Sequence, residues 1–302
     1  MTSVRESPTV VVVLVNWNSE YDTAECLESL AEQTFDDFCV IVVDNGSERT
    51  SIGYLMDRFE WPIYLQNEEN QGFTGGNNTG IECALELNPE WLFLLNNDTT
   101  IEETLIEELV RAATDLPNKA GIVGPLIHTY ETHKIWSAGG KVNPITGQSS
   151  HRMGSFEEYS QPERVDYVVG AGMLIQTDVF ESIGLLDDDF FLYYEDTEFC
   201  YRAREAGWDV WYVPISGIYH KDSIDYVFSR LREYYFTRNR WLFIQKTQPM
   251  HRRIVFYFYF LIRWVVLQVI YLLCVNRDPP AARATLKGAL HALIGNVGKL
   301  GN

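Results

Sequence analysis

The sequence predicts an α/β protein built on a largely parallel sheet and followed by a hydrophobic helical tail. Short β-branched runs alternate with helical stretches over the first 125 residues, which is the pattern of βα units. A 22-residue apolar stretch, 254–275, lies near the C-terminus. Residues 1–227 carry 40 acidic and 12 basic side chains, whereas residues 228–302 carry 2 and 12. We therefore predict a globular domain over 1–248 and a membrane-associating helical tail over 249–302.

Each predicted strand of the first part is a short apolar run between two helical stretches. Strands are expected at residues 10–15, 40–44, 63–66 and 91–95. Helices are expected at residues 23–33, 52–59, 77–87 and 102–116. Right-handed crossovers bring the C-terminal ends of such strands to one edge of the sheet, where ligands of open α/β sheets bind. Polar residues that follow these strands are therefore candidates for a binding site.

The pattern becomes irregular from residue 121 to residue 220, where Gly and Pro interrupt it. A mixed sheet with long loops is expected here, with a hairpin around 136–142 and a short helix over 177–183. A long helical stretch should follow residue 225 and lead to the apolar run.

Charge and cysteine usage exclude some classes of protein. The acidic first part argues against a nucleic-acid partner, because phosphate backbones would be repelled, whereas the basic, aromatic tail suits an anionic membrane surface. The chain has 17 Arg and 7 Lys, a balance typical of proteins kept soluble in high salt. Its five cysteines show no pairing pattern, so neither a zinc site nor a disulfide framework is indicated. The first apolar run is too short for a signal peptide, so the first domain should be cytosolic.

Polar residues end the first two predicted strands. Asn16 follows the first, and Asp44 with Asn45 ends the second. A carboxylate in this place can accept hydrogen bonds from a nucleobase or a ribose. The alternative is an Asx turn that caps a loop.

A Gly-rich segment, residues 70–78, follows the third strand. Its glycines let the backbone approach a ligand closely, and the helix that it opens favours anions such as a diphosphate. A flexible loop that uses Gly only for its turn geometry is the alternative. The segment is not GxGxxG and does not follow the first strand, so a dinucleotide-binding fold is disfavoured.

Asn96, Asn97 and Asp98 end the fourth apolar strand. A carboxylate there can hold a divalent ion against a diphosphate, and hard oxygen ligands suit Mg²⁺ or Mn²⁺. The alternative is that Asp98 only caps the helix that follows.

Taken in order, the four segments VNWN (15–18), VVDNGS (42–47), NQGFTGGNN (70–78) and LLNNDT (94–99) resemble the successive motifs of family 2 glycosyltransferases. The resemblance is strongest to the rhamnosyltransferase-like subgroup and spans residues 9–245. It implies a GT-A fold, which is a Rossmann-like nucleotide-binding mixed sheet flanked by helices. It also implies a nucleotide-diphosphate-sugar donor and inversion at the anomeric carbon.

The resemblance assigns roles to individual residues. Asp44 matches the acid that binds the nucleoside, and Asp98 matches the metal-binding acid, with His220 completing the metal or diphosphate site. Where the family often has Asp-x-Asp, this chain has Asn96, so one metal carboxylate is absent. The expected nucleotide-sugar contacts are Asn16, Asp44, Asn45, Asn70, Gly72, Gly76, Asn77 and Asn97.

The acceptor side is also assigned by the resemblance. Asp196 matches the general base that deprotonates the acceptor hydroxyl. The expected acceptor contacts are Glu195 and the small-residue loop at Gly170, Ala171 and Gly172. Repulsion between Glu195 and Asp196 would raise a pKa, and a helix N-terminus would oppose that shift. The alternative is that these acids only complement the helix dipole and pair with Arg202. Arg238, Asn239 and Arg240 match a terminal Arg-Asn signature that would brace the donor site or the membrane face.

The apolar stretch is long enough to span a bilayer, but Arg263 would lie near the midplane at a cost of roughly 2.5–3.5 kcal/mol. Both of its flanks are basic. An in-plane or re-entrant helix followed by a basic amphipathic stretch, 281–300, fits better. A membrane location at the cytoplasmic face suggests a lipid-linked acceptor, such as a polyprenyl or dolichyl phosphate glycan. The alternative is a hydrophobic helix in a homodimer interface.

Two other classes of protein remain as alternatives. A sugar nucleotidyltransferase would be expected to carry an early Gly-rich loop with a basic residue, and the segment after the first strand has neither. A non-catalytic, membrane-bound sugar-binding subunit would keep the fold without turnover, and the three aspartates argue against it.

Overall fold

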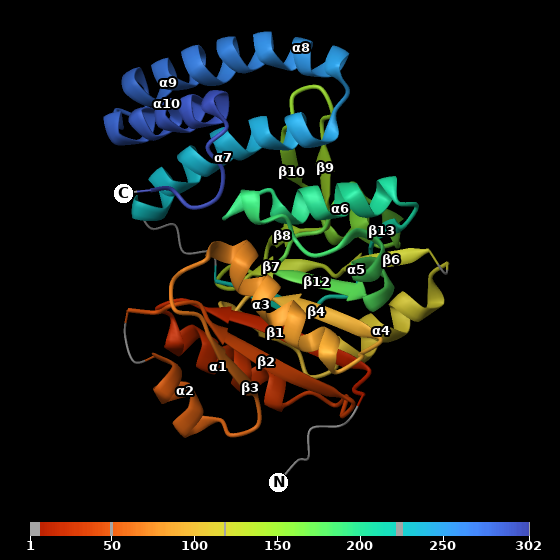
Figure 1. Ribbon diagram of the computed structural model, residues 1–302. Coiled ribbons are helices and arrows are strands. Elements are labelled where there is room, and N and C mark those ends of the chain that lie inside the picture. The colour runs from red at the N-terminus through yellow and green to blue at the C-terminus, as the bar shows by residue number, and fades with distance from the viewer. Residues whose placement is uncertain (1–6, 49–50, 118, 222–225, 302) are drawn as a thin grey trace.

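The computed structural model describes residues 7–48, 51–117, 119–221 and 226–301. Within them, an eight-stranded mixed sheet forms the centre of the lower part of the molecule (Figure 1). Its strands, in order across the sheet, are β11 (Glu163–Arg164), β13 (Asp209–Tyr212), β6 (Ala120–Gly124), β12 (Gly172–Gln176), β4 (Trp91–Leu95), β1 (Val10–Asn16), β2 (Phe38–Asp44) and β3 (Ile63–Gln66). The strand predictions are confirmed to within about two residues, and the mixed α/β architecture is confirmed.

Strand β1 lies at the centre of the hydrophobic core. It pairs in parallel with β2 and β4, and β2 pairs in parallel with β3. The side chains of Val10 to Leu14 are fully buried, as expected for a parallel strand covered on both faces. Strand β12 runs antiparallel to β4 and β6. The register places Asn16 opposite Asp44 and Leu95 opposite Gly172, so the strand ends meet at one edge of the sheet.

Helices cover both faces of this sheet. They are α1 (Glu20–Ala31), α2 (Ser51–Arg58), α3 (Gly72–Glu86), α4 (Leu105–Asp115), α5 (Thr177–Ile183) and α6 (Glu195–Glu205). Short 3-10 turns are η1 (Phe156–Tyr159) and η2 (Asp188–Phe190). The acids of the first turn of α6 complement the positive end of its dipole, and Glu198 pairs with Arg202 one turn later.

The Gly-rich segment is helix rather than loop, which corrects the prediction. Helix α3 begins at Gly72, five residues before the expected start. Its glycines allow it to lie close against β1. A Cβ at Gly76 would lie 2.7 Å from Val15 Cγ1, and one at Gly80 would lie 2.4 Å from Val13 Cγ1. Close approach to the sheet therefore outweighs the low helix propensity of glycine.

The prediction of a hairpin around 136–142 is wrong. Strand β8 (Ile135–Ser137) pairs with β7 (Ile127–Thr129) in a separate sheet that also contains β14 (Ile218–His220) and β5 (Thr99–Ile101). The hairpin nearby is formed by β9 (Gly140–Val142) and β10 (Ser149–His151). The left-handed φ of +73° at Gly139 separates β8 from β9, so the two runs pair with different partners.

Above the sheet lies a helical layer, coloured blue in Figure 1. It consists of α7 (Tyr226–Thr247), α8 (Met250–Tyr259), the π-helical η3 (Phe260–Leu267), α9 (Gln268–Cys274) and α10 (Pro279–Ile294). Pro249 precedes α8, Pro279 opens α10 and the left-handed Gly295 ends it, as their backbone preferences predict. Helix α10 packs along α7, and α8 to α9 form one continuous rod that lies along them, with α9 and η3 against α10 and α8 against α7 (Figure 1).

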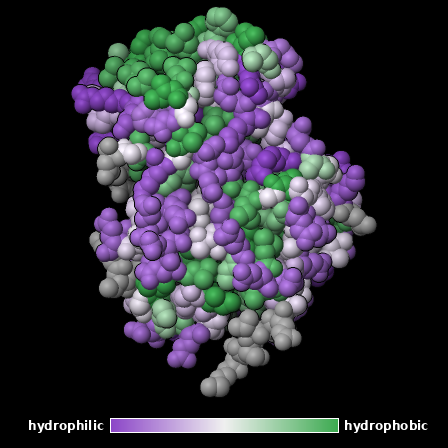
Figure 2. Space-filling view, viewed as in Figure 1, coloured by the Kyte–Doolittle hydropathy of each residue, from purple (hydrophilic) through white to green (hydrophobic). Residues whose placement is uncertain are grey.

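The outer surface of this layer is apolar. The helix Met250–Cys274 has a mean hydropathy of 1.9 over its most apolar window, and 11% of that window is buried. Figure 2 shows the resulting hydrophobic surface at the top of the molecule. Exposed members on α10 are Leu286, Leu290, Leu293 and Ile294.

Candidate active site

The ends of β1 and β2 form a polar corner around Asp44. Asp44 is buried, and its Oδ1 accepts hydrogen bonds from Asn16 Nδ2 at 2.9 Å and Ser47 Oγ at 2.5 Å. Gln66 Nε2 lies 3.5 Å from its other oxygen. Asn16 Oδ1 in turn accepts from Thr23 Oγ1 at 2.9 Å. The predicted pair Asn16 and Asp44 is therefore brought into direct contact.

Beside this corner is a cavity of about 230 Å³. Gly46, Ser47, Gln66, Asn67 and Glu68 line it. Gly46 has φ +67°, and a Cβ there would lie 2.3 Å from the backbone of Glu69. Ser47, Gln66 and Asn67 were not predicted as site residues, although Gln66 stands at the end of the third predicted strand, where a binding residue is expected.

Asn45 connects this corner to the start of α3. Its Nδ2 donates to Gly72 O at 2.8 Å, and its Oδ1 accepts from Asn67 Nδ2 at 3.0 Å and from Gln71 N at 3.1 Å. Asn70 Oδ1 accepts from Gly72 N at 2.7 Å. Asn45, Asn70 and Gly72 therefore lie together as predicted, with their polar groups engaged in shaping the turn.

The remaining donor-side residues occupy two places. Asn77 Nδ2 donates to Phe73 O within α3 at 2.8 Å, and Gly76 lies against Asn45. Asn97 Nδ2 donates to Ser19 Oγ at 2.7 Å and to Thr23 Oγ1 at 2.8 Å, which links it to Asn16 through Thr23.

Asp98 and His220 meet where β4 gives way to β5. The distance from His220 Nε2 to Asp98 Oδ1 is 3.4 Å, and Asn96 Nδ2 lies 3.2 Å from the same nitrogen. Among the described residues, the buried atoms Asp98 Oδ1 and His220 Nδ1 have no hydrogen-bond partner. Burial raises the pKa of Asp98, and the neighbouring His220 opposes that shift.

This pair of residues fits a divalent cation. An unpaired buried carboxylate oxygen beside an imidazole supplies one hard and one borderline ligand, and the open positions suit phosphate oxygens or water. No group of three or more His, Cys, Asp or Glu side chains with an arrangement that could hold a metal ion occurs in the described part of the chain. Asn96 stands where the family often has a second metal-binding carboxylate, and its side chain contacts His220.

Asp196 lies in the first turn of α6, against the small-residue loop. Its Oδ2 accepts from Gly170 N at 3.3 Å, and its Oδ1 accepts from Thr197 N at 2.5 Å and Thr197 Oγ1 at 3.0 Å. Burial raises the pKa of Asp196, whereas these donors and the charge of His151 lower it. The balance leaves the pKa of this carboxyl above its usual value, which strengthens it as a base.

Asp98 and Asp196 are joined by the adjacent ends of β4 and β12. Asn96 N lies 3.4 Å from Ala171 O, and Gly170 N donates to Asp196. Gly172 pairs with Leu95, and a Cβ at Gly170 would lie 2.8 Å from Phe73 Cζ. The loop 170–172 therefore separates the metal-binding candidates from the candidate base, as the predicted roles require.

Glu195, next to Asp196, is buried, and its Oε2 has no hydrogen-bond partner among the described residues. Burial, and then the charge of Asp196, raises the pKa of Glu195 well above its usual value. The predicted repulsion therefore acts on Glu195 in the direction expected. The two residues before it, Tyr193 and Tyr194, have φ of +68° and +75°, a conformation that bulky residues rarely adopt.

The strained segment is fastened from the helical layer. Asn239 Nδ2 donates to Leu192 O at 2.8 Å and to Tyr193 O at 2.7 Å. Arg238, whose side chain is fully buried, donates to Asp189 O at 3.1 Å and to Gly298 O. Gly298 N donates to Asp189 O at 2.9 Å. The Arg-Asn signature and the C-terminal end of the chain therefore brace the segment that leads to Asp196.

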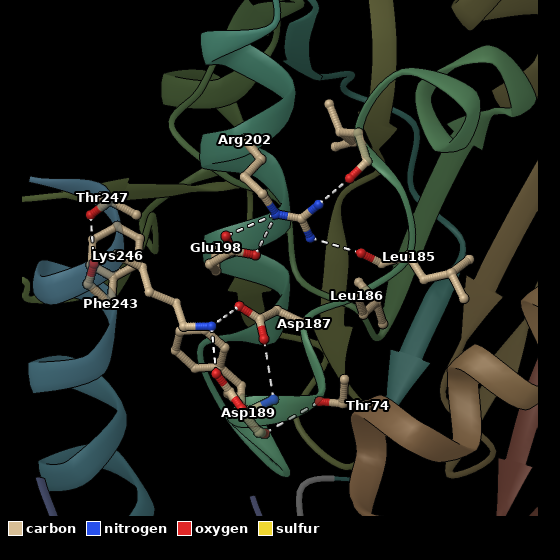
Figure 3. Close-up of polar contacts among 12 residues, drawn as sticks. Thr74, Leu185, Leu186, Asp187, Asp189, Glu198, Arg202, Phe243, Lys246 and Thr247 are labelled. Atoms are coloured by element: carbon tan, nitrogen blue, oxygen red, sulfur yellow. Dashed lines mark hydrogen bonds and ion pairs between the residues drawn. The ribbon is translucent and has the colours of Figure 1, made fainter. Parts of the chain in front are cut away.

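Figure 3 shows the other side of this brace. Lys246 Nζ lies 2.5 Å from Asp187 Oδ2 and 2.6 Å from Asp189 Oδ2, so α7 also contacts η2 through an ion pair. Arg202 holds the preceding turn by donating to Leu185 O at 2.8 Å while it pairs with Glu198. Thr74 Oγ1 donates to Phe190 O at 3.3 Å, which joins the segment to α3.

The mixed sheet, the polar strand ends and the carboxylates beside them define the GT-A class of nucleotide-sugar-dependent enzymes. Comparison with known proteins agrees. The pattern of glycosyl transferase family 2 matches residues 11–184, more than half of the chain. The chain therefore belongs to glycosyl transferase family 2 and is a glycosyltransferase, with rhamnosyltransferases among its relatives.

Named relatives and a solved structure support this placement. The low-salt glycan biosynthesis hexosyltransferase Agl10 of Haloferax volcanii is 30% identical over 229 residues, 71% of this chain and 67% of that protein. An N-acetylglucosaminyl-diphospho-decaprenol L-rhamnosyltransferase of Mycobacterium tuberculosis is 26% identical over 69% of this chain and 75% of its own length. The structure of GalNAc-T7 with UDP, GalNAc and Mn²⁺ shares the fold, with a TM-score of 0.62 and 16% identity over 87% of this chain and 57% of that chain.

Proposed function

We propose that this enzyme transfers a sugar from a nucleotide-diphosphate donor to a lipid-linked glycan acceptor at a membrane surface, with inversion at the anomeric carbon. The observation that carries the proposal is the arrangement of three acids along one sheet edge. Asp44 lies in the corner at β1 and β2, Asp98 at the end of β4, and Asp196 across the loop 170–172. This order matches the order of nucleoside, diphosphate and acceptor along a bound substrate pair.

In this reaction Asp44 and Asn16 bind the nucleoside part of the donor, and Asn45 fixes the turn that opens α3. Asp98 and His220 would hold a divalent cation, Mg²⁺ or Mn²⁺, which supplies charge neutralisation for the leaving diphosphate when it is bound. The structure of GalNAc-T7, which was solved with UDP and Mn²⁺, supports the choice of these partners.

The proton of the acceptor hydroxyl is transferred to a carboxylate oxygen of Asp196. As the acceptor oxygen bonds to the anomeric carbon, the bond from that carbon to the diphosphate oxygen breaks, and the nucleoside diphosphate leaves with the bonding electrons. The raised pKa of Asp196 makes it a stronger base than an exposed aspartate. Gly170 and Thr197 keep its oxygens oriented.

A direct test compares Asp196→Asn and Asp196→Ala with Asp178→Asn, which replaces an exposed acid on α5. Product from labelled donor sugars and membrane-extracted lipid acceptors is measured by mass spectrometry, with donor binding as a second readout. We expect transfer to fall about 10²–10⁴-fold in both Asp196 variants while donor binding persists. Equal product from the wild type and both variants would contradict the assignment of the base. Formation of a nucleotide sugar from a sugar phosphate would instead indicate a nucleotidyltransferase.

The lipid-linked acceptor is supported by two observations. One curated relative is named for a diphospho-decaprenol substrate. The helical layer also exposes a broad apolar surface next to basic residues, which include Arg252, Arg277, Arg283 and Lys287. Since the rod of α8 to α9 packs lengthwise on α7 and α10, an in-plane orientation on an anionic bilayer follows more readily than a span. All five cysteines are free, which suits a protein facing the reducing cytoplasm.

Membrane association is tested by flotation with vesicles that contain anionic lipid. Leu290→Glu combined with Leu293→Glu should reduce the partition by about 10²–10⁴-fold, because burying each of these exposed Leu side chains in the bilayer contributes about 1.5–3 kcal/mol. Met56→Glu, an equally exposed apolar residue on α2, serves as the matched control and should float like the wild type. If the double variant floats normally but loses a dimer in size-exclusion chromatography, the apolar surface is a homodimer interface instead.

A further inference from the structure

A groove of about 460 Å³ lies beside the β9 to β10 hairpin and the 3-10 turn η1. Among its lining residues are Lys141, His151, Arg152, Glu158 and Tyr159. The groove is close to the β11 edge of the large sheet, whereas the Asp44 corner is near the opposite edge at β3. None of its residues takes part in the donor or metal sites described above.

The hairpin that forms one wall is fixed in place. Its tip contacts α7 and the residue before α6, because Tyr194 Oη donates to Gly147 O at 2.8 Å and a Cβ at Gly147 would lie 2.9 Å from Ile244 Cγ1. Figure 1 shows the hairpin rising from the sheet toward α7. The wall of the groove is therefore held by the same segment that leads to Asp196.

One lining residue of the groove, His151, is connected through aromatic contacts to the candidate metal site. His151 packs edge-on against Trp136, with ring centroids 4.7 Å apart, and Trp136 stacks on His220 at 4.5 Å. His151 is also close enough to Asp196 for its charge to lower the pKa of that carboxyl. A ligand in the groove would therefore reach the space beside Asp196 from the side opposite the donor corner.

The charges of the groove indicate a neutral, hydroxyl-rich ligand. Arg152 is already engaged, since it pairs with Glu163 at 2.8 Å and lies over the Tyr159 ring at 4.6 Å. Lys141 and Glu158 make no ion pair with any described residue, so they remain available on the same surface. Acids and bases both line the groove, so it favours neither an anion nor a cation, whereas a donor and an acceptor in one groove suit the hydroxyl groups of a sugar.

We propose that this groove is the binding site for the sugar of the acceptor, with Lys141 and Glu158 selecting its hydroxyl pattern and His151 directing the attacking hydroxyl toward Asp196. The proposal rests on the proposed function, because it presumes that a sugar accepts the transferred group. It makes Lys141 and Glu158 determinants of acceptor specificity, and His151 a positioning residue.

The test uses the full-length protein without donor. Saturation-transfer NMR is recorded with a panel of methyl hexopyranosides of gluco, galacto, manno and N-acetylgluco configuration. At least one glycoside should bind the wild type, and Lys141→Ala and Glu158→Gln should each weaken that binding about tenfold, the size expected for one charge-assisted hydrogen bond. Asp44→Asn, in the donor corner, should leave it unchanged.

Three outcomes would overturn the proposal: no glycoside binds the wild type, binding is unchanged in both groove variants, or binding is lost in Asp44→Asn. The experiment involves no turnover, so it can fail while sugar transfer is confirmed with the Asp196 variants, and the reverse is also possible. A second readout follows acceptor KM in the transfer assay, where His151→Gln should raise KM and shift the pH profile of kcat.

Discussion

Replacing Gly72 with alanine tests whether α3 and the segment before α6 are fitted to each other through their backbones. Gly72 has φ +78°, and a Cβ there would lie 2.1 Å from the carbonyl oxygen of Phe191 and 2.6 Å from its Cδ2. Ordinary Cβ contacts begin near 3.4 Å, so the Phe191 carbonyl would have to move by about 1 Å or more. That movement would disturb the contact from Thr74 N and the strained residues that follow.

The expected loss has two parts. A left-handed non-glycine residue costs roughly 1–2 kcal/mol, and the overpacking against Phe191 adds about 1–3 kcal/mol, so the free energy of unfolding should fall by about 2–5 kcal/mol. A displacement of about 1 Å near the reacting groups can cost about 100-fold in rate. Asp196 lies only five residues after Phe191. We therefore expect kcat to fall about 100-fold, with a smaller change in donor affinity.

The chain offers a matched control in Gly184. Its φ is +75°, but no atom lies within 4 Å of the position that a Cβ would take. Its ψ is −168°, so Gly184→Ala should show only a backbone cost of about 1–3 kcal/mol and a wild-type kcat. Denaturant unfolding and transfer kinetics measured on both variants separate the two effects. If Gly72→Ala retains wild-type kcat, or if both variants lose kcat equally, the fit between Gly72 and Phe191 does not position the base.

Two further predictions concern buried charged groups. Burial and the charge of Asp196 raise the pKa of Glu195. At any pH between the ordinary and the raised pKa, the folded protein therefore binds more protons than the unfolded chain. The free energy of unfolding then falls as pH rises through that window. Glu195→Gln should therefore gain stability relative to the wild type as pH rises above about 4.5, and parallel unfolding curves against pH would contradict this. Arg238→Lys should lose about 2–4 kcal/mol of stability and lower kcat more than donor affinity, because one ammonium cannot serve both Asp189 O and Gly298 O. Arg283→Lys, on the exposed side of α10, is its control, and equal stability losses in the two variants would argue against the brace.

The parallel half of the fold was predictable because each of its strands coincides with a short apolar run in the sequence. Buried β-branched runs predict β1 to β4, and the polar residues that end them identify Asn16, Asp44 and Asp98 as neighbours. The register then brings Asn16 and Asp44 into contact without any further signal. The small residues at 170–172 and the acids at the start of α6 were assigned to the acceptor side only through the family resemblance, and that role stays a prediction; their contact with each other is seen in the hydrogen bond from Gly170 N to Asp196.

Other features could not be read from the sequence because they depend on contacts between distant segments. Glycine lowers helix propensity locally, and only the approach of α3 to Val13 and Val15 explains why helix begins at Gly72. Strand β8 pairs with β7, which precedes it, and β9 pairs with β10, which follows it. The apolar run 136–142 alone does not indicate these partners. Gln66 ends the third predicted strand, but only the register of β2 with β3 places it opposite Asp44. Ser47 ends the VVDNGS segment, and only the turn after β2 brings its hydroxyl to Asp44.

The contacts of α7 join the helical layer to the sheet domain. Asn239 and Arg238 fasten residues 189–193 from one side, and Arg238 also binds Gly298, which follows α10. A truncation after residue 248 would remove Gly298 and leave one donor of a fully buried guanidinium without its carbonyl partner. The surface that we assign to the membrane and the segment that presents Asp196 are therefore joined through one buried arginine. If lipid docking shifts α10, Gly298 and Arg238 would transmit the shift to the segment that contains the strained residues Tyr193 and Tyr194. An enzyme truncated after residue 248 lacks this connection, so vesicles should change the activity of the full-length enzyme and not that of the truncated one.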